Sequence, residues 1–173
     1  PEVFDHHIIN IHHLPLMDVL KHSKTLRDTE NAYKEAIKII RGILNETRPD
    51  AILLSGTYYM PWLISVAAKK EKIPVILWYS GVLSKETEHY PDKLRKLFLS
   101  MEKSVLKNST QIIFPSDLCK KTVEELVVKS KIKNSYVIPN PVASIFTDPS
   151  AVDASIERRI AAVGRYSKIK NFN

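Results

Sequence analysis

The chain has 173 residues, of which 44% are hydrophobic and 26% are charged, with 4 Gly and 10 Pro. These values exclude a disordered chain, a collagen-like repeat and a disulfide-stapled mini-domain, and the length suits one domain or slightly more. The 26 Lys and Arg against 19 Asp and Glu give a net charge of +7, which favours anionic partners: nucleic acid, anionic lipid headgroups or phosphorylated small molecules.

The cysteine content and the lengths of the apolar runs indicate in which cellular compartment the protein is expected. Cys119 has no second cysteine with which to form an internal disulfide. The sequence shows neither an apolar run of about 18 residues nor a basic-then-apolar leader, the signals of membrane spanning and of secretion. We therefore expect a reducing, cytoplasmic setting.

The first predicted elements are a strand, a helix and a second strand. A β-branched stretch at residues 3–14 predicts a strand that ends at Pro15. Apolar residues then recur at three- and four-residue steps from 24 to 47, the period of a helix with one buried stripe. Pro49 ends this helix, and a continuous apolar run at 51–56 predicts a strand covered on both faces, as in a parallel sheet.

The alternation continues along the chain. Helices are predicted at 61–70, with Pro61 at the first helical position, at 94–106, and after Ser116, whose helix is expected to pack through Val123, Leu126 and Val127. Further strands are predicted at 74–79, 110–114, 135–138 and 159–164. Such alternation requires right-handed crossovers over a parallel sheet. The fold class is therefore α/β, with a Rossmann-like parallel sheet and helices on both faces.

The stretch from 144 to 156 is small and polar and has neither helical nor strand periodicity, which is typical of a linker. We interpret residues 1–150 as one Rossmann-like domain, residues 151–156 as a linker and residues 157–173 as the start of a second domain.

Parallel sheets of this kind bind ligands at the carboxyl ends of their strands, where loops converge and helix N-termini point at the crevice. The predicted loops there carry small or hydroxylated residues suited to sugar or phosphate oxygens. The candidate cleft-lining residues are Gly56, Tyr58, Ser80, Gly81, Ser116 and Asn140. Taken singly, the two glycines need only supply turns and Ser116 need only cap its helix.

Several other functions lack support in the sequence. No Gly-x-Gly-x-x-Gly follows a strand and no phosphate-binding P-loop motif occurs, which argues against a dinucleotide dehydrogenase and a P-loop NTPase. Same-face histidines at 6, 7, 12 and 13 are too far apart in a strand to share a metal ion. Cys119 is expected to be a structural thiol. Lysines at 120–121 and 129–133 have no interleaved aromatic residues and predict solvated faces, not a nucleic-acid stripe.

Four stretches together carry a resemblance to a known family. They are residues 48–53, residues 72–81, residues 109–121, and the ordered pair 137–146 (Val-Ile-Pro-Asn-Pro-Val…Phe) and 162–171 (Ala-Val-Gly-Arg…Lys-Asn). In these stretches the chain resembles the N-terminal half of a two-Rossmann-domain (GT-B type) retaining glycosyltransferase, carbohydrate-active family four. The resemblance covers roughly residues 45 to 173.

The last stretch also has a physical interpretation of its own. Gly164 gives the backbone conformational freedom after the predicted strand. Arg165 and Lys170 place two cations near the carboxyl end of that strand, an arrangement suited to binding a diphosphate. The resemblance implies that Gly164, Arg165, Lys170 and Asn171 bind a nucleotide-sugar donor, without a metal or other cofactor. It also implies a sugar, lipid or small-molecule acceptor and no nucleic acid. A peripheral contact with the cytoplasmic face of a membrane is open, although no amphipathic basic helix stands out to make it.

The chain also departs from the family pattern. It lacks the Gly-rich opening βα unit, it has Ser80 where the family often has His, and Pro141 follows Asn140 in place of the commoner Gly. We interpret the chain as a fragment that is itself inactive, and no residue is assigned a catalytic role. The alternatives are a complete flavodoxin-like module that binds an anionic ligand or partner, and a fragment of a nucleotide-sugar epimerase.

Overall fold

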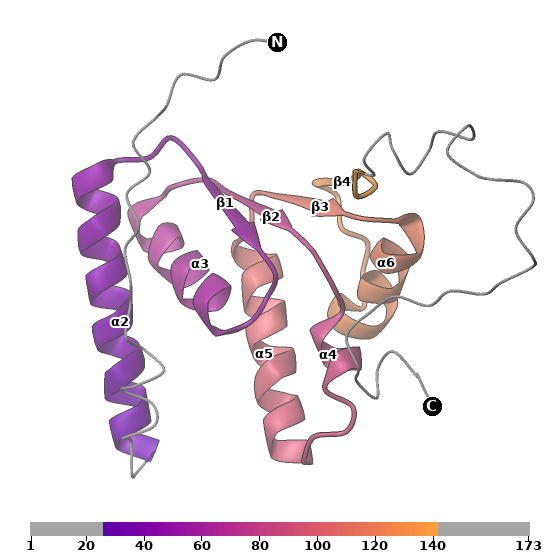
Figure 1. The fold of residues 1–173 in the computed structure, drawn as a ribbon, viewed down its shortest axis with the longest axis horizontal. Coiled ribbons are helices and arrows are strands. Elements are labelled where there is room, and N and C mark those ends of the chain that lie inside the picture. The colour runs from indigo at the N-terminus through magenta and orange to yellow at the C-terminus, as the bar shows by residue number, and fades with distance from the viewer. Residues whose placement is uncertain (1–25, 142–173) are drawn as a thin grey trace, which may run out of the picture.

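The computed structural model describes residues 26–141, which form a four-stranded parallel sheet flanked by helices (Figure 1). The strands are β1 (Ile52–Ser55), β2 (Val75–Trp78), β3 (Gln111–Phe114) and β4 (Ser135–Val137), and they lie in the order β1-β2-β3-β4. All three pairings are parallel. The predicted α/β class with a Rossmann-like sheet is confirmed.

Helices fill the gaps between the strands. They are α2 (Leu26–Thr47), α3 (Tyr59–Glu71), the short α4 (Leu83–Glu86), α5 (Asp92–Asn108) and α6 (Asp117–Thr122), which continues into the π-helical segment η1 (Val123–Val128). The predicted helix at 24–47 corresponds to α2. The helix predicted from Pro61 begins two residues earlier, at Tyr59. Proline fits there because the N–H groups of the first helical turn have no partner within the helix.

The helix after β3 differs from its prediction in one residue. Val123 and Val127 are fully buried, as expected, but Leu126 is 48% exposed. The reason is the π-helical geometry of η1, whose i→i+5 hydrogen bonds widen the turn and rotate Leu126 away from the face that Val123 and Val127 share. The buried Glu124 ties this segment to the chain before β4, because its carboxylate accepts hydrogen bonds from Lys131 Nζ and Ile132 N, both at 2.9 Å.

One face of the sheet forms the core. The side chains on that face are buried and pack with α3, α5 and η1; they include Leu54, Val75, Leu77, Ile112 and Phe114. Helix α2 packs outside α3, and Arg41 on α2 forms an ion pair with Glu71 at the end of α3. Right-handed crossovers between strands in sequential order place their helices on one side, and Figure 1 shows the described helices on one side of the strands.

The opposite face of the sheet is apolar and open in the described part of the chain. Leu53 on β1 is 67% exposed and Tyr136 on β4 is 55% exposed, with Trp78 and Ile113 half-buried between them. In the strand register, Trp78 lies opposite Ile113 and Ile113 opposite Tyr136, so these side chains form a continuous row. No helix of residues 26–141 covers this second face, so the predicted helices there stay a prediction.

Several predictions fall on residues that are not described. These are the strand at 3–14 with its histidines, the linker at 151–156, and the start of a second domain at 157–173 with its strand at 159–164. Among residues 26–141, no helix is long and apolar enough to cross a membrane.

Candidate functional site

The carboxyl ends of the four strands meet at one edge of the sheet, and the predicted cleft residues follow them there. Gly56 and Tyr58 come after β1, Ser80 and Gly81 after β2, Ser116 after β3, and Asn140 after β4. Backbone hydrogen bonds continue the ladder past the strand ends: Tyr79 N donates to Ile113 O at 2.8 Å, and Ile138 N to Phe114 O at 2.9 Å. The loops therefore start from one rigid edge.

The loops after β1 and β2 touch each other. Gly56 N donates a hydrogen bond to Trp78 O at 3.0 Å, and Gly56 has φ +81°, a conformation that favours glycine. A Cβ at Gly56 would lie 3.6 Å from Ser80 Oγ, so the structure brings Gly56 and Ser80 together. The Ser80 side chain is exposed at this point. Its hydroxyl can donate to or accept from a polar ligand.

Tyr58 belongs to an aromatic cluster at the same edge. Its ring centroid lies 5.2 Å from those of Tyr59 and Phe98, and Tyr90 lies 5.8 Å from Phe98. Burial raises the pKa of Tyr58 and of Tyr59 above the ordinary value of 10, and nearby Tyr90 adds to the effect. Both phenols therefore keep their protons at neutral pH and can act as hydrogen-bond donors.

The loop that carries Ser80 and Gly81 is held by one buried carboxylate. Glu102 on α5 is fully buried, and its Oε1 accepts hydrogen bonds from Tyr79 Oη and, at 2.8 Å, from Leu83 N. Its Oε2 accepts from Ser84 N at 3.1 Å. Tyr79 immediately precedes the loop and Leu83 begins α4, so a single side chain fixes both ends of residues 80–82. We call this arrangement the Glu102 clamp.

The clamp also sets the protonation of its members. Burial raises the pKa of Glu102, while the hydrogen bonds from Tyr79 and the 83–84 turn act in the opposite direction. Burial, followed by the Glu102 charge, raises the pKa of Tyr79 well above 10, so Tyr79 is the donor in their hydrogen bond. The half-buried Cys119 thiol has its pKa raised by the same two causes, which suits a structural thiol and not a nucleophile.

The remaining candidate residues lie apart from this contact. Ser116 caps α6, as predicted: its Oγ accepts a hydrogen bond from Cys119 N at 3.2 Å. Gly81 faces the helix α4 that follows it, since a Cβ there would lie 2.5 Å from Glu86 Oε1. Asn140 is exposed beyond β4. The structure therefore brings Gly56 and Ser80 together, and it places Ser116 and Asn140 on the same edge without a described contact to them.

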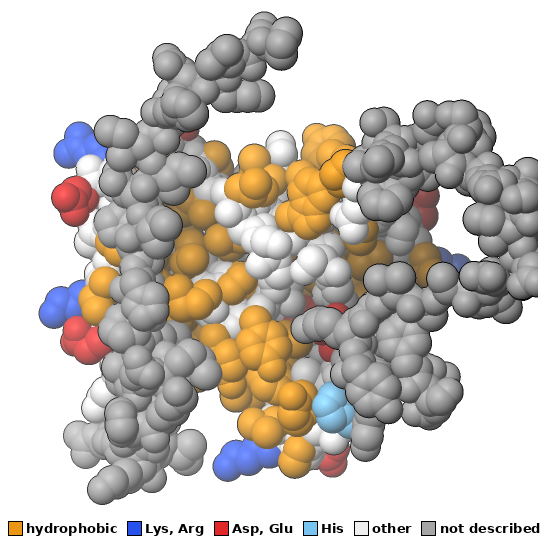
Figure 2. All heavy atoms as spheres, viewed as in Figure 1, with side chains coloured by type: hydrophobic (Ala, Val, Ile, Leu, Met, Phe, Trp, Pro, Cys, Tyr) orange, Lys and Arg blue, Asp and Glu red, His pale blue; other side chains and the backbone are white. Residues whose placement is uncertain are grey.

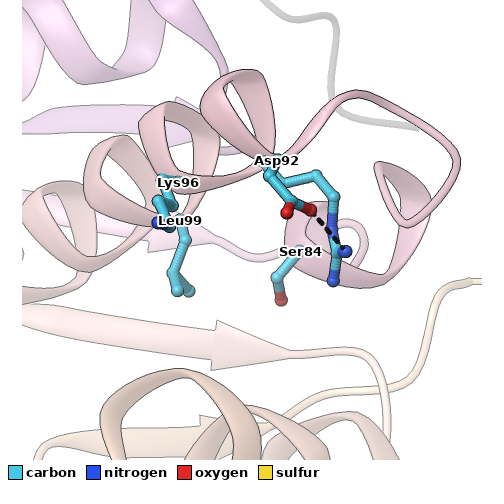
Figure 3. Close-up of a pocket in the computed structure, with 5 residues that line it drawn as sticks. Ser84, Asp92, Lys96 and Leu99 are labelled. Carbon is cyan, nitrogen blue, oxygen red and sulfur yellow. Dashed lines mark hydrogen bonds and ion pairs between the residues drawn. The ribbon is translucent and has the colours of Figure 1, made fainter.

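A pocket of about 240 Å³ lies between α4 and the first turns of α5 (Figure 3). Its lining residues are Ser84, Asp92, Arg95, Lys96 and Leu99. Asp92 and Arg95 form an ion pair at 3.4 Å, and the side chains of Ser84 and Leu99 point the same way in Figure 3. The sequence had not indicated this pocket, because α4 has too few residues to show a period.

The predicted donor-binding residues, Gly164, Arg165, Lys170 and Asn171, lie outside the described range. Within residues 26–141 no group of three or more His, Cys, Asp or Glu could hold a metal ion. Sequence reasoning missed Glu102. The available signal was a charged residue on the buried stripe of the predicted helix at 94–106, between Met101 and Val105.

A comparison with known families bears on the whole arrangement. The model of Glycosyltransferase Family 4 matches residues 3–144. The match reaches closer to the N-terminus than the stretches that first indicated the family, and it ends before Gly164 and Arg165. No curated protein matches the chain. The family match covers most of the sequence and the entire described sheet with its loops, and the chain therefore belongs to glycosyltransferase family 4.

Proposed function

We propose that the protein to which this chain belongs transfers a sugar from a nucleotide-diphosphate sugar to an acceptor, with retention of the anomeric configuration. The bond from the anomeric carbon to the diphosphate breaks and a bond to the acceptor oxygen forms, giving a glycoside, a nucleoside diphosphate and a proton. The chain would supply the acceptor-side domain, in the cytoplasm. Its membership of glycosyltransferase family 4 is the observation that carries the proposal.

The described edge supports a role in holding the acceptor. Gly56 and Ser80 form a contact between two loops at the carboxyl ends of neighbouring strands, and the Glu102 clamp holds one of these loops. Exposed hydroxyls on rigid backbone suit an acceptor sugar or alcohol, because they can bind it without first being ordered. The sugar or alcohol would lie over Ser80, near the phenol of Tyr58.

The donor side is proposed for residues 164–171. Arg165 and Lys170 would neutralise the diphosphate and stabilise the departing nucleotide, with Gly164 and Asn171 completing the contact. Two charge-assisted contacts supply roughly 3 to 6 kcal/mol, whereas association costs at least about 4 kcal/mol. We therefore expect the 173-residue chain alone to be inactive and to show no micromolar binding of nucleotide sugars in isothermal titration.

The full-length protein provides the test. It is incubated with a panel of nucleotide-diphosphate sugars and an acceptor extract, nucleoside diphosphate release is measured, and the anomeric configuration of the product is read by NMR. The double variant Arg165→Ala/Lys170→Ala is expected to lose at least about a hundredfold in kcat. Lys133→Ala, at an exposed lysine that is not among the predicted donor residues, is the matched control and should keep full turnover. Unchanged turnover in the double variant, or an inverted product, would contradict the proposal.

A further inference from the structure

Four large side chains stand exposed together at the start of α5. Tyr58 is 42% exposed, and Tyr90, Leu94 and Leu97 are each 39% exposed. The buried Phe98 lies against them, since the rings of Tyr58 and Tyr90 both pack against it and Leu94 lies one helical turn before it. Figure 2 shows hydrophobic side chains gathered where Figure 1 has the start of α5. We call Tyr58, Tyr90, Leu94 and Leu97 the aromatic-leucine patch.

The outward face of the same helix carries four lysines. Lys93, Lys96, Lys103 and Lys107 recur at steps of three, seven and four residues, which places them on one side of α5. All four are exposed, and none has a carboxylate within 4.0 Å in the part of the chain that the structure describes. The acidic residues of α5 do not offset them, because Asp92 pairs with Arg95 and Glu102 is buried.

The combination points to a specific kind of surface. Single exposed apolar side chains are ordinary, but a contiguous group of them marks an interaction site. Tyrosine favours the boundary between lipid and water, and leucines beside lysines form the amphipathic pattern that lies on bilayers rich in anionic lipid. The unpaired lysines supply the charge that complements anionic headgroups. A nucleic acid would use the lysines but would have no need of Leu94 and Leu97.

We propose that the first turns of α5, with the aromatic-leucine patch and the flanking Lys93 and Lys96, dock on an anionic lipid bilayer. Leu94, Leu97 and the tyrosine rings enter the headgroup boundary, and the lysines contact lipid phosphates and carboxylates. The surface lies beside the carboxyl ends of the strands, so docking would bring that edge to the membrane. This inference does not depend on the donor residues or on sugar transfer, and its test needs neither.

The experiment uses the 173-residue chain and vesicles of phosphatidylcholine mixed with phosphatidylserine, or of phosphatidylcholine alone. In co-sedimentation we expect binding to the mixed vesicles, weak binding to the neutral ones, and a decline with rising salt. Lys93→Gln/Lys96→Gln should weaken binding roughly tenfold or more. Leu94→Ser/Leu97→Ser should weaken it to a similar degree, because the apolar contact is lost while every charge is kept.

Matched controls come from another part of the surface. Leu118, 75% exposed on α6, and Leu126, 48% exposed on η1, provide Leu118→Ser/Leu126→Ser, and the exposed lysines after η1 provide Lys129→Gln/Lys133→Gln. Both controls should bind the mixed vesicles like the unaltered chain, and circular dichroism with urea unfolding verifies that each variant is folded. The inference is overturned by no binding at low salt or by equal losses in the controls. Unchanged binding of the Leu94→Ser/Leu97→Ser variant to the mixed vesicles also overturns it. In that case, displacement of the vesicles by a short DNA duplex would show that the lysines bind polyanions in general.

Discussion

Glu102 shows how one buried residue can organise a loop at a distance along the chain. Its carboxylate has three hydrogen-bond donors, from Tyr79, Leu83 and Ser84, and no exposure to solvent. A buried acceptor with its donors in place is stable, but burying its charge is costly. The balance of these two effects sets how the protein responds to pH.

We predict that Glu102→Gln removes a pH dependence of stability. Burial raises the pKa of Glu102 above its ordinary value of 4.5, so in the interval above 4.5 the folded protein binds more protons at this site than the unfolded chain does. The free energy of unfolding therefore falls as pH rises through that interval, by at most about 1.4 kcal/mol per pH unit. Urea unfolding of both proteins between pH 4.5 and 7.5 measures the difference. Parallel pH profiles for the two proteins would contradict the prediction.

Individual residues were predicted well where their role is local. Ser116 was expected to cap a helix and does so, because capping depends only on the next few residues. Leu94 and Leu97 belong to the apolar spacing that predicts the helix at 94–106, yet both are 39% exposed. Periodicity shows that side chains share a face, but how far the neighbouring elements cover that face depends on the tertiary arrangement. The same limit hid Glu102, whose partners lie 18 to 23 residues earlier in the chain.

At the scale of elements, we expect replacement by alanine to have opposite effects on stability at two glycines. Gly42 lies in α2 with nothing within 4 Å of an added Cβ, so Gly42→Ala should stabilise the protein by about 0.5–1 kcal/mol through helix propensity. Gly56 has φ +81° at the end of β1, so Gly56→Ala should destabilise it by about 1–2 kcal/mol through backbone strain. Thermal unfolding of both variants measures the two effects, and changes of the same sign would contradict this account.

The described strands and long helices were all predicted from the sequence, and their bounds differ from the predicted ones by at most two residues. Continuous apolar runs such as 51–56 predict buried parallel strands because both faces of such strands are usually covered. Two features were not predicted: the helix α4 and the π-helical geometry of η1. Helix α4 has only four residues, fewer than a hydrophobic period needs, and η1 keeps helical spacing while changing which residues face the core. Both depend on contacts outside themselves: α4 is held by Glu102 of α5, and η1 is held through its own Glu124 by Lys131 and Ile132.

At the scale of the molecule, the two faces of the sheet should respond differently to truncation. Leu77 is fully buried under the helices, so Leu77→Ala should cost about 2–5 kcal/mol of unfolding free energy. Leu53 on the neighbouring strand is 67% exposed on the other face, so Leu53→Ala should change stability by no more than about 0.5 kcal/mol. Urea unfolding compares them. A cost at Leu53 similar to that at Leu77 would contradict the open face.

The candidate site was predictable to the extent that topology determines it. Parallel strands bring their carboxyl ends to one edge, so Gly56, Ser80, Ser116 and Asn140 were expected to share that edge, and they do. The close contact between Gly56 and Ser80 depends on strand register, which the sequence does not specify. The cationic face of α5 beside exposed leucines likewise emerged only once the packing of that helix was known.

The Glu102 clamp has a consequence for how far the loop at 80–82 can vary in sequence. The three residues at 80–82 are anchored from outside by a side chain on another helix, and the nearest obstacle to a larger residue at position 81 is the flexible tip of Glu86. Substitutions within the loop are therefore separated from the cost of keeping it in place. Ser80 and its neighbours could therefore be exchanged, which would change what this loop can bind, while the scaffold stays unchanged.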